Sequence, residues 1–494
     1  MKYLTKAEYA RGFQCPKMLW MDENMPKFAV KTEDSSRKRI WESTKKAARQ
    51  YFGLCVEVSK DATEEEMLEQ TRKFLEAGEC KIANAAFCYD MAFCTIDMLL
   101  VTDDKLCIVD INASTKKKMK YYDAMAYDYY ILSNALGKKV EKVIHMHINS
   151  KYVREGELDL DKLFLLEDCM EEVRQRQKET KRMIKLLKKQ KEQKEEIKKE
   201  VGVQCYLPNH CNYWQYCHKD ILEPSIFSIH GLHAKERYEL YYAGIVSFLD
   251  VLREDVELLE GQKMQVETEI YNKEPTIRKD EIKEFLDTIS YPLYFLDFET
   301  FQQAVPEYEG VKPYLPIPFQ YSLHVLQKEG ALLEHYEFLA KEGEDPRRAV
   351  AEHLCKHIPR NVCILAYNMG FEKSVLKNLA LLYSDLREHL TNLQKNMRDL
   401  MTPFRNHSYY CKEMEGSHSI KSVLPALYPD QKEYDYHALA GVHNGEEAMN
   451  IFAELTNYDE EEKRKIREEL LAYCNLDTLG MVKILEKLRE AVES

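Results

Sequence analysis

The sequence predicts a mixed α/β protein with two folded domains. Its 494 residues, 45% of them hydrophobic, suffice for two or three domains with buried cores. Apolar runs of strand length alternate with longer segments of helical periodicity. No run of 18 apolar residues occurs, so we expect no membrane-spanning helix.

Charge and cysteine content indicate the cellular compartment and the way in which a nucleic-acid ligand would be bound. Met1–Ala10 is charged and lacks an apolar segment, so we expect no signal peptide and a cytoplasmic location. The net charge is −13, so a nucleic-acid ligand would have to be bound by local basic patches or by metal ions. In a reducing compartment the 14 cysteines are not expected to form disulfides. Those that occur singly in apolar or mixed stretches are interpreted as small buried side chains: Cys55, Cys88, Cys94, Cys107, Cys169, Cys355, Cys363 and Cys474.

The N-terminal third is predicted to combine strands with one long helix. Met91–Leu100, Lys105–Asn112 and Val143–Asn149 have the composition and length of strands. Tyr121–Leu136 has the pattern of a helix that Gly137 ends.

A charged helix is predicted over residues 170–200, which contain neither glycine nor proline. Within it, Lys181–Glu200 holds nine Lys or Arg residues against four Glu. This segment is either a solvated connector or a basic arm that contacts a nucleic-acid backbone. Residues 222–285 are predicted to be mostly helical.

From Tyr291 onward the pattern is typical of an α/β domain. The Asp345-Pro346 pair predicts the start of a helix, and helices dominate after the last strand. The predicted strands are Tyr294–Phe298, Phe319–Gln327, Leu332–Leu339 and Val362–Tyr367.

Two acidic residues interrupt the first of these strands. Asp297 and Glu299 are separated by one residue, so their side chains share one face of the strand. Two adjacent carboxylates repel unless a cation lies between them, and Mg²⁺ or Mn²⁺ is the usual cation for oxygen ligands. Taken alone, the pair is equally well explained as an accident at the end of a strand.

Two later segments carry polar groups at the spacing of site residues. Asn368 and Glu372 fall at a predicted strand-to-helix junction, where Glu372 could instead be a first-turn acid that favours the helix dipole. Tyr473 and Asp477 are four residues apart on the predicted penultimate helix and therefore share a helical face. A buried tyrosine beside a surface acid is the other explanation of that pair.

In this order the segments resemble the three motifs of the DnaQ-like DEDD exonucleases, and the tyrosine resembles that of the DEDDy subgroup. The resemblance covers about residues 290–490 and implies an RNase H-like fold that hydrolyses phosphodiesters with two metal ions. It implies that Asp297 bridges both ions, while Glu299 and Asp477 complete the coordination. Tyr473 would orient the attacking water. Glu372 replaces the commoner Asp and would coordinate an ion directly or through a water.

Four other cysteines resemble the iron–sulfur ligands of RecB-like nucleases, including the CRISPR-associated ones. Cys15 precedes Pro16 near the start of the chain, and Cys205, Cys211 and Cys217 follow much later. In that family such cysteines attach the N-terminus to the end of the domain. Four thiolates suit a [4Fe–4S] cluster, with tetrahedral Zn²⁺ as the alternative.

RecB-like nucleases cut with a PD-(D/E)XK core, and this chain departs from that pattern. Asp97 and Asp110 match the two acids, but Asn112 stands where the family has a lysine and Trp41 where it has a histidine. An uncharged amide cannot stabilise developing negative charge as a lysine does. We therefore expect a restriction-endonuclease-like domain whose metal site at Asp97 and Asp110 is vestigial, and which keeps its fold for binding nucleic acid.

Together these patterns predict a RecB-like domain over 1–222, a helical connector over 223–288 and an exonuclease domain over 289–494. We expect a 3′→5′ exonuclease that acts on DNA rather than RNA, in particular single-stranded DNA, in DNA repair, defence against mobile elements or CRISPR-like processing. One alternative is a non-catalytic nucleic-acid-binding scaffold. The other is a protein with two active nuclease sites, in which a displaced lysine compensates for Asn112. Lys421 is either a phosphate contact or a solvated side chain.

Overall fold

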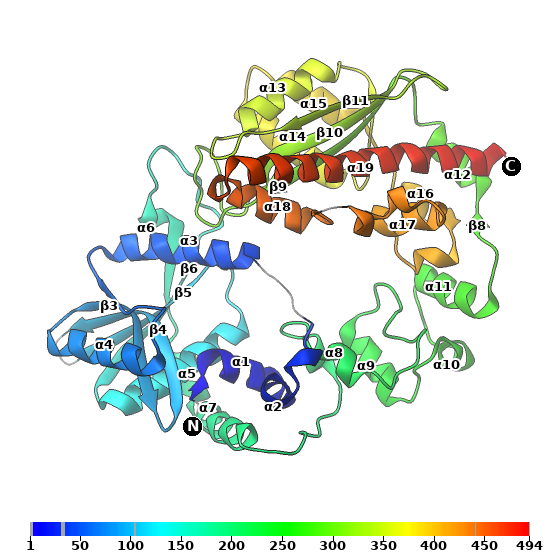
Figure 1. Ribbon diagram of the computed structural model, residues 1–494. Coiled ribbons are helices and arrows are strands. Elements are labelled where there is room, and N and C mark those ends of the chain that lie inside the picture. The colour runs from blue at the N-terminus through cyan, green and yellow to red at the C-terminus, as the bar shows by residue number, and fades with distance from the viewer. Residues whose placement is uncertain (1–2, 31–34, 103–104, 440, 494) are drawn as a thin grey trace. The chain divides into compact units, whose positions relative to one another are not determined.

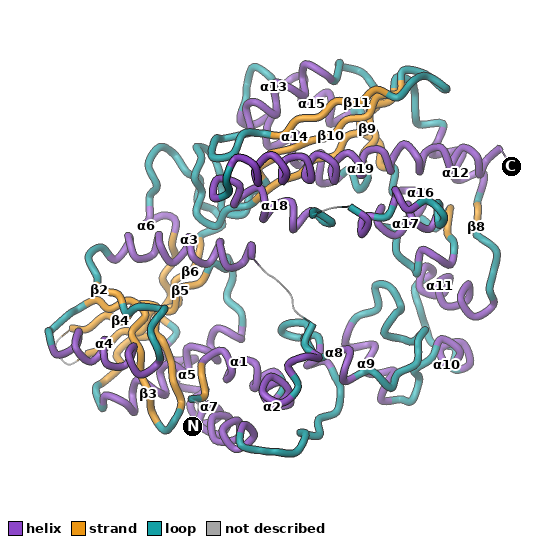
Figure 2. The backbone as a smooth tube through the Cα atoms, in the orientation of Figure 1, coloured by secondary structure: helices purple, strands orange, loops and turns teal. Residues whose placement is uncertain are grey.

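The structure, a computed structural model of the chain, is mixed α/β as predicted (Figure 1). Helices and strands alternate along most of the chain, and long loops join some of them (Figure 2). Within the part of the chain that is described, no helix is long and apolar enough to cross a membrane. The described residues are 3–30, 35–102, 105–439 and 441–493.

The chain divides into two compact units. The first consists of Met1–Asp220 and Gln303–Tyr314, and the second of Ile221–Gln302 and Leu315–Ser494. The helices predicted to connect two domains, at 223–288, belong to the second unit.

A seven-stranded mixed sheet forms the centre of the first unit. Its order is β2-β3-β4-β5-β6-β7, and β1 pairs with β4. Strand β5 is antiparallel to β4 and parallel to β6, so the predicted strands at 91–100, 105–112 and 143–149 are neighbours in one sheet. The strands are β1 (Leu4–Thr5), β2 (Val56–Glu57), β3 (Lys81–Tyr89), β4 (Ala92–Thr102), β5 (Lys105–Asn112), β6 (Lys139–Ile148) and β7 (Phe164–Asp168).

Helices pack against this sheet through their apolar faces. Helix α5 ends at Gly137, as predicted, because that residue adopts a left-handed conformation with φ of 62°. The first-unit helices are α1 (Lys6–Gln14), α2 (Pro16–Asn24), α3 (Ser35–Phe52), α4 (Glu64–Glu76), α5 (Met119–Leu136), α6 (Leu160–Leu163), α7 (Met170–Lys191) and α8 (Trp214–Cys217), with 3₁₀ turns at Pro26–Phe28 and Val203–Cys205.

The basic segment predicted as one helix over 170–200 differs from that prediction in two ways. Helix α7 ends at Lys191, and Trp20 donates a hydrogen bond of 3.1 Å to the Gln193 carbonyl just beyond it. The helix is also no solvated connector, since Met183, Ile184 and Leu187 are buried in the core of the first unit. An apolar stripe thus lets this helix pack in the core although the segment is strongly charged.

The second unit is built on a five-stranded sheet of order β11-β10-β9-β12-β13. Strand β9 is central, antiparallel to β10 and parallel to β12. A short pair, β8 with β14, lies outside this sheet. The strands are β8 (Thr276–Ile277), β9 (Leu293–Phe301), β10 (Ile317–Leu326), β11 (Glu334–Leu339), β12 (Cys363–Ala366), β13 (Met397–Asp399) and β14 (Tyr409–Tyr410).

Tyr473 and Asp477 lie on the last helix, not on the penultimate one that the sequence predicted. Helix α19 runs unbroken through Gly480, where a Cβ atom would lie 2.8 Å from Leu424 Cδ2, so this glycine permits close packing instead of ending the helix. The second-unit helices are α9 (Ala234–Tyr242), α10 (Phe248–Arg253), α11 (Glu260–Tyr271), α12 (Lys279–Leu286), α13 (Arg347–His357), α14 (Gly370–Leu382), α15 (Arg387–Lys395), α16 (Thr402–Arg405), α17 (Ile420–Leu427), α18 (Gly445–Glu454) and α19 (Glu460–Glu493), with 3₁₀ turns at Lys412–Met414, Lys432–Tyr434, Tyr436–Ala438 and Leu455–Asn457.

Candidate active site

The central strand of the second unit presents two acids to the same side. Asp297 and Glu299 are two residues apart on β9 and pair in register with Ser322 and Gln320 of β10. Most of β9 is buried, because apolar residues such as Leu296 and Phe298 pack in the core on its flanks. The two carboxylates therefore have a rigid backbone beneath them.

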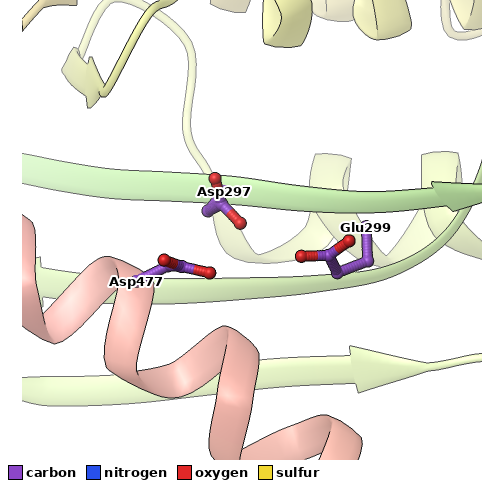
Figure 3. A group of neighbouring side chains, drawn as sticks. All are labelled: Asp297, Glu299 and Asp477. Atoms are coloured by element: carbon purple, nitrogen blue, oxygen red, sulfur yellow. The ribbon is translucent and has the colours of Figure 1, made fainter. Parts of the chain in front are cut away.

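Helix α19 supplies a third acid to this place. One ligand oxygen each from Asp297, Glu299 and Asp477 lies within 4.8 Å of the other two (Figure 3). Among the described residues these three form the sole group of three or more potential metal ligands at such spacing. Glu299 and Asp477 are only 7% and 6% exposed, so water compensates little of their charge.

Burial and mutual repulsion change the acidity of all three groups. They raise the pKa of Asp297 well above its ordinary value, with Asp477 as the largest charged contributor. Burial and the Asp477 charge raise the pKa of Glu299 to about 8. Burial raises the pKa of Asp477 to about 6, against hydrogen bonds from Tyr436 and Tyr473 and the Lys421 ammonium. These carboxyl groups resist ionisation because no cation neutralises them. A hard divalent cation such as Mg²⁺ or Mn²⁺ would stabilise their ionised form and prefers such oxygen ligands.

Glu372 lies near this group without belonging to it. It is in the first turn of α14, after Asn368, whose backbone has a left-handed φ of 66°. Its side chain is buried, and Oε2 has no hydrogen-bond partner among the residues that the structure describes. Burial, Asp399 and Asp477 raise its pKa to about 8. A buried carboxylate oxygen without a hydrogen-bond partner is suited to coordinate a metal ion at this position, either directly or through a water molecule.

Two aromatic rings and a lysine surround Asp477. The Tyr436 hydroxyl donates a hydrogen bond of 2.7 Å to Asp477 Oδ1. The Lys421 Nζ atom lies 5.1 Å from the ring centroids of both Tyr436 and Tyr473 and donates to the His443 carbonyl at 3.1 Å. Lys421 is therefore a cation near the acids, although its hydrogen bond is to backbone. Tyr436 could not be predicted from the sequence, because it belongs to no motif and reaches the site from a 3₁₀ turn.

Cys474 is buried as the sequence predicted, and it has a contact with the site that the sequence did not predict. Its thiol donates to Asp297 Oδ2 at an Sγ–O distance of 3.8 Å. One turn further along the same helix face, the Thr478 hydroxyl contacts Ser322 Oγ at 2.6 Å and His324 Nδ1 at 2.8 Å. These contacts fix α19 against β10 and so hold Asp477 opposite β9.

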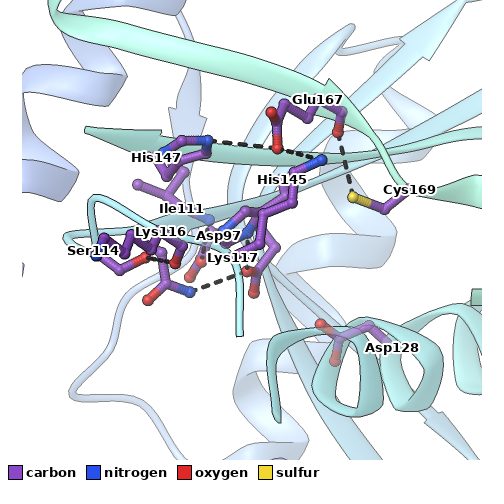
Figure 4. A network of polar contacts seen from close by, with 12 residues as sticks. Asp97, Ile111, Ser114, Lys116, Lys117, Asp128, His145, His147, Glu167 and Cys169 are labelled. Atoms are coloured by element: carbon purple, nitrogen blue, oxygen red, sulfur yellow. Dashed lines mark hydrogen bonds and ion pairs between the residues drawn. The ribbon is translucent and has the colours of Figure 1, made fainter. Parts of the chain in front are cut away.

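In the first unit, the two acids of the predicted vestigial site are already paired with protein donors. Asp97 forms an ion pair with Lys45 and accepts a hydrogen bond of 2.8 Å from the Ile111 amide. Asp110 lies 3.3 Å from Lys6 Nζ and accepts from Asn112 Nδ2 at 3.1 Å. Burial opposes the ionisation of Asp110, but Lys6, His145 (Figure 4) and the hydrogen bond from Asn112 together outweigh it and hold the pKa of Asp110 below its usual range.

Both lysines were missed by the sequence analysis because neither is close to the acids along the chain. Lys45 lies one turn after Trp41 on α3, with Nζ 3.4 Å from the Trp41 ring centroid. Lys6 also pairs with Asp128 at 2.6 Å. Burial raises the pKa of Asp128 to about 7, so Lys6 is shared between two carboxylates of different acidity.

The four cysteines of the predicted cluster lie in one neighbourhood of the first unit. The Cys211 amide donates to the Cys205 carbonyl at 2.9 Å, and Gln14, beside Cys15, donates to the carbonyls of Gln204 and Asn209 at 2.7 Å. Burial raises the pKa of Cys211 to about 11, and Cys205, Cys15 and Cys217 each add to that rise. Their sulfurs are not grouped at metal-ligand spacing among the described residues, so the shared cluster or Zn²⁺ site stays a prediction.

Comparison with known proteins gives one match. Residues 294–419 match a protein family described as a domain of unknown function (DUF2779). The matched part includes Asp297, Glu299 and Glu372 but ends before Tyr473 and Asp477. No curated protein and no solved structure matches the chain.

Proposed function

We propose that the second unit is a metal-dependent nuclease that removes nucleotides from the 3′ end of a nucleic-acid strand. The observation that carries the proposal is the convergence of Asp297, Glu299 and Asp477 within 4.8 Å, from a strand and a helix far apart in the sequence. The direction of attack and the preference for single-stranded DNA over RNA rest on the motif resemblance. Repair or defence against mobile elements is the biological setting that we propose with it.

Divalent ions, when bound, would activate water and stabilise the leaving oxygen of the phosphodiester. Asp297 and Glu299 would hold them from the rigid strand, and Asp477 from the facing helix. Tyr436 keeps Asp477 in place through its hydrogen bond, while Tyr473 lies beside the same carboxylate. The Lys421 ammonium opposes the rise in the pKa of Glu299 and is the nearby cation suited to a substrate phosphate.

The decisive experiment follows release of mononucleotides from strands labelled at either end. With Mg²⁺ or Mn²⁺, the full-length protein should shorten the strand from its 3′ end. Asp297→Ala should reduce this rate by roughly 10³-fold or more while retaining nucleic-acid binding, since phosphate contacts come mostly from cationic and backbone groups. Glu337→Gln, which removes an acid from the edge strand β11, is the matched control. Undiminished degradation by Asp297→Ala would refute the proposal.

We propose further that the first unit binds nucleic acid without cutting it. The pairing of Asp97 with Lys45, and of Asp110 with Lys6, favours this view, because both acids already have a cationic partner. The same lysines are the observation that would favour a second active site, if either acts as a displaced catalytic lysine. Activity of a variant changed only in the second unit separates these possibilities.

Four thiolates, from Cys15, Cys205, Cys211 and Cys217, are proposed to hold a [4Fe–4S] cluster, with Zn²⁺ as the alternative. The cluster would be structural, closing the loop between the start of the chain and the end of the first unit. Protein purified without oxygen should be brown and contain about four iron atoms per chain. A colourless protein with one zinc ion per chain would show that the site binds Zn²⁺ and no iron–sulfur cluster. Absence of any bound metal would exclude both.

A further inference from the structure

The exposed face of helix α7, which is labelled in Figure 1, carries a row of basic side chains. The members of this outward row follow one another at intervals of three or four residues and are all exposed to solvent: Arg174, Lys178, Lys181, Lys185 and Lys189. With 3.6 residues per turn, these intervals place all five within an arc of about 80° on one side of the helix. At 1.5 Å per residue, the row is about 22 Å long.

The outward row differs from the other basic residues of α7 in having no acidic partner. Within the described part of the chain, the five row residues form no ion pair. The other four cations of the helix are each paired with an acid: Arg176 with Asp123, Arg182 with Glu179, Lys188 with Asp90 and Lys191 with Glu8. The whole chain has a net charge of −13, so the row is not part of a generally basic surface. Five adjacent cations without counter-charges attract an anionic partner.

The opposite face of α7 fixes the row in place. Met183, Ile184 and Leu187 are buried in the core of the first unit, and Gln177 donates a hydrogen bond of 3.1 Å to the Ala126 carbonyl of α5. The backbone that carries the row is therefore ordered before any partner binds. A partner does not have to fold this helix, which lowers the entropic cost of binding.

Two kinds of extended polyanion could bind such a row, a nucleic-acid strand or an anionic membrane surface. Helices that bind a membrane surface insert an apolar face among the lipids. In α7 that face lies inside the first unit, and none of the large apolar side chains found exposed among the described residues belongs to this helix. A line of single charges without exposed apolar neighbours is suited to the repeating phosphates of a nucleic-acid backbone.

We propose that the outward row of α7 binds the phosphate backbone of a nucleic-acid strand and does not read its sequence. Lysine ammonium groups contact phosphates as point charges and carry no preference for particular bases. The inference rests on the proposed binding of nucleic acid by the first unit and assigns that binding to a surface. It does not depend on catalysis by the second unit.

The test measures the affinity of full-length protein for a labelled single strand at several salt concentrations. Asp297→Ala serves as the parent protein, so that the strand is not shortened. The triple variant Lys178→Gln, Lys181→Gln, Lys185→Gln should bind roughly tenfold or more weakly at about 0.1 M salt, whatever the sequence of the strand. The slope of log affinity against log salt should fall by about 2, because each phosphate contact on a single strand contributes about 0.7.

Two control proteins separate the charge of the row from other effects. Arg72→Gln, Lys73→Gln, Lys162→Gln removes the same total charge from exposed residues of the first unit that are paired with acids, and it should keep the affinity and slope of the parent. Replacing the three row lysines by arginine keeps their charge and should also preserve binding. Equal losses in the glutamine variant of the row and in the first control would overturn the proposal.

Ultraviolet cross-linking of the bound strand, followed by peptide mapping, tests separately whether the first unit binds nucleic acid. Cross-links within Met1–Asp220, together with unchanged affinity and salt slope in the glutamine variant of the row, would overturn the role of the row and uphold binding by the first unit. Absence of cross-links to the first unit in the parent would overturn both. Binding to phosphatidylserine vesicles that the row variant loses, without any loss of strand binding, would assign the row to a membrane surface and refute the proposal.

Discussion

Buried carboxylates without a counter-ion make the second unit sensitive to pH. The pKa values of Glu299 and Glu372 are raised to about 8, whereas an unfolded Glu titrates near 4.3. The folded, metal-free state therefore binds protons more tightly than the unfolded one. The stability that this provides is fully present below about pH 4 and is lost as pH rises through 8.

The first prediction follows from this sign. Between about pH 5 and 8.5 the metal-free second unit should lose on the order of 2 kcal/mol of unfolding free energy, and Mg²⁺ should restore most of it at the upper end. Thermal denaturation across this range, with and without Mg²⁺, measures the effect. Glu299→Gln should flatten the pH dependence. A metal-free protein that becomes more stable with rising pH, relative to that variant, would contradict the prediction.

Tyr436 gives a second prediction at the scale of a residue. Its hydrogen bond favours the ionised form of Asp477, so Tyr436→Phe should raise the pKa of Asp477 further. Protons then compete better with the metal, and the apparent Mg²⁺ dissociation constant should rise about tenfold at pH 6 but less at pH 8. Calorimetric Mg²⁺ titrations at both values test this. Tyr434→Phe, in the preceding turn, is the control, and equal effects of the two variants would argue against the role of Tyr436.

The carboxylates of the candidate site could be predicted from the sequence, whereas their neighbours could not. Asp297 and Glu299 share a face of one strand, and Asp477 shares a helix face with Tyr473; the expectation that the three acids converge came from the resemblance to the exonuclease motifs. Tyr436 and Cys474 are common residue types outside any such pattern. Only the fold brings them to the acids, so their role became visible with the tertiary structure.

At the scale of elements, the predicted strands lie close to observed ones, but β3, β7 and β13 were not predicted, and helix ends were predicted less well. The strand prediction for 105–112 matches β5, since apolar length and period are local properties. Helix α7 ends at Lys191, and Trp20 donates to the Gln193 carbonyl just beyond that end; α19 continues through Gly480, where the absence of a side chain leaves room for Leu424. Both features involve residues distant in the sequence, which local patterns do not contain.

A third prediction concerns the packing of α1 against α7. At Gly12 a Cβ atom would lie 2.6 Å from Leu187 Cδ2 and 2.8 Å from Leu19 Cδ1, so several side chains would have to move together. Gly12→Ala should therefore lower the unfolding free energy of the first unit by about 1–3 kcal/mol, despite the better helix propensity of alanine. Urea denaturation monitored by tryptophan fluorescence measures this. Gly370→Ala, where a Cβ atom meets open space, is the control, and similar stability of the two variants would show that α1 is loosely packed.

At the scale of the whole molecule, the two units differ in whether their buried acids have a cationic partner. In the first, Asp97 and Asp110 each have a lysine partner, and Lys6, His145 and Asn112 keep the pKa of Asp110 low although the group is buried. In the second, Asp297 and Glu299 repel Asp477 and resist ionisation. Carboxylates that are already paired with lysines gain little stability by binding metal ions. Carboxylates that lack a cationic partner are stabilised when they bind metal ions.

The last prediction tests this difference directly. Asp97→Ala alone would leave Lys45 buried and unpaired, which costs about 3–5 kcal/mol and could unfold the first unit. The double variant Asp97→Asn with Lys45→Met removes both charges together and should keep the unit folded. We expect this protein to shorten 3′-labelled strands at a rate within about twofold of the unchanged chain, because the acids proposed to hold the catalytic ions are in the second unit. Circular dichroism verifies folding, and a closed circular substrate detects internal cuts. The opposite outcome is an endonuclease activity in Asp297→Ala that disappears when Asp97→Asn and Lys45→Met are added to it. That result would show that the first unit also cuts nucleic acid, through a displaced lysine.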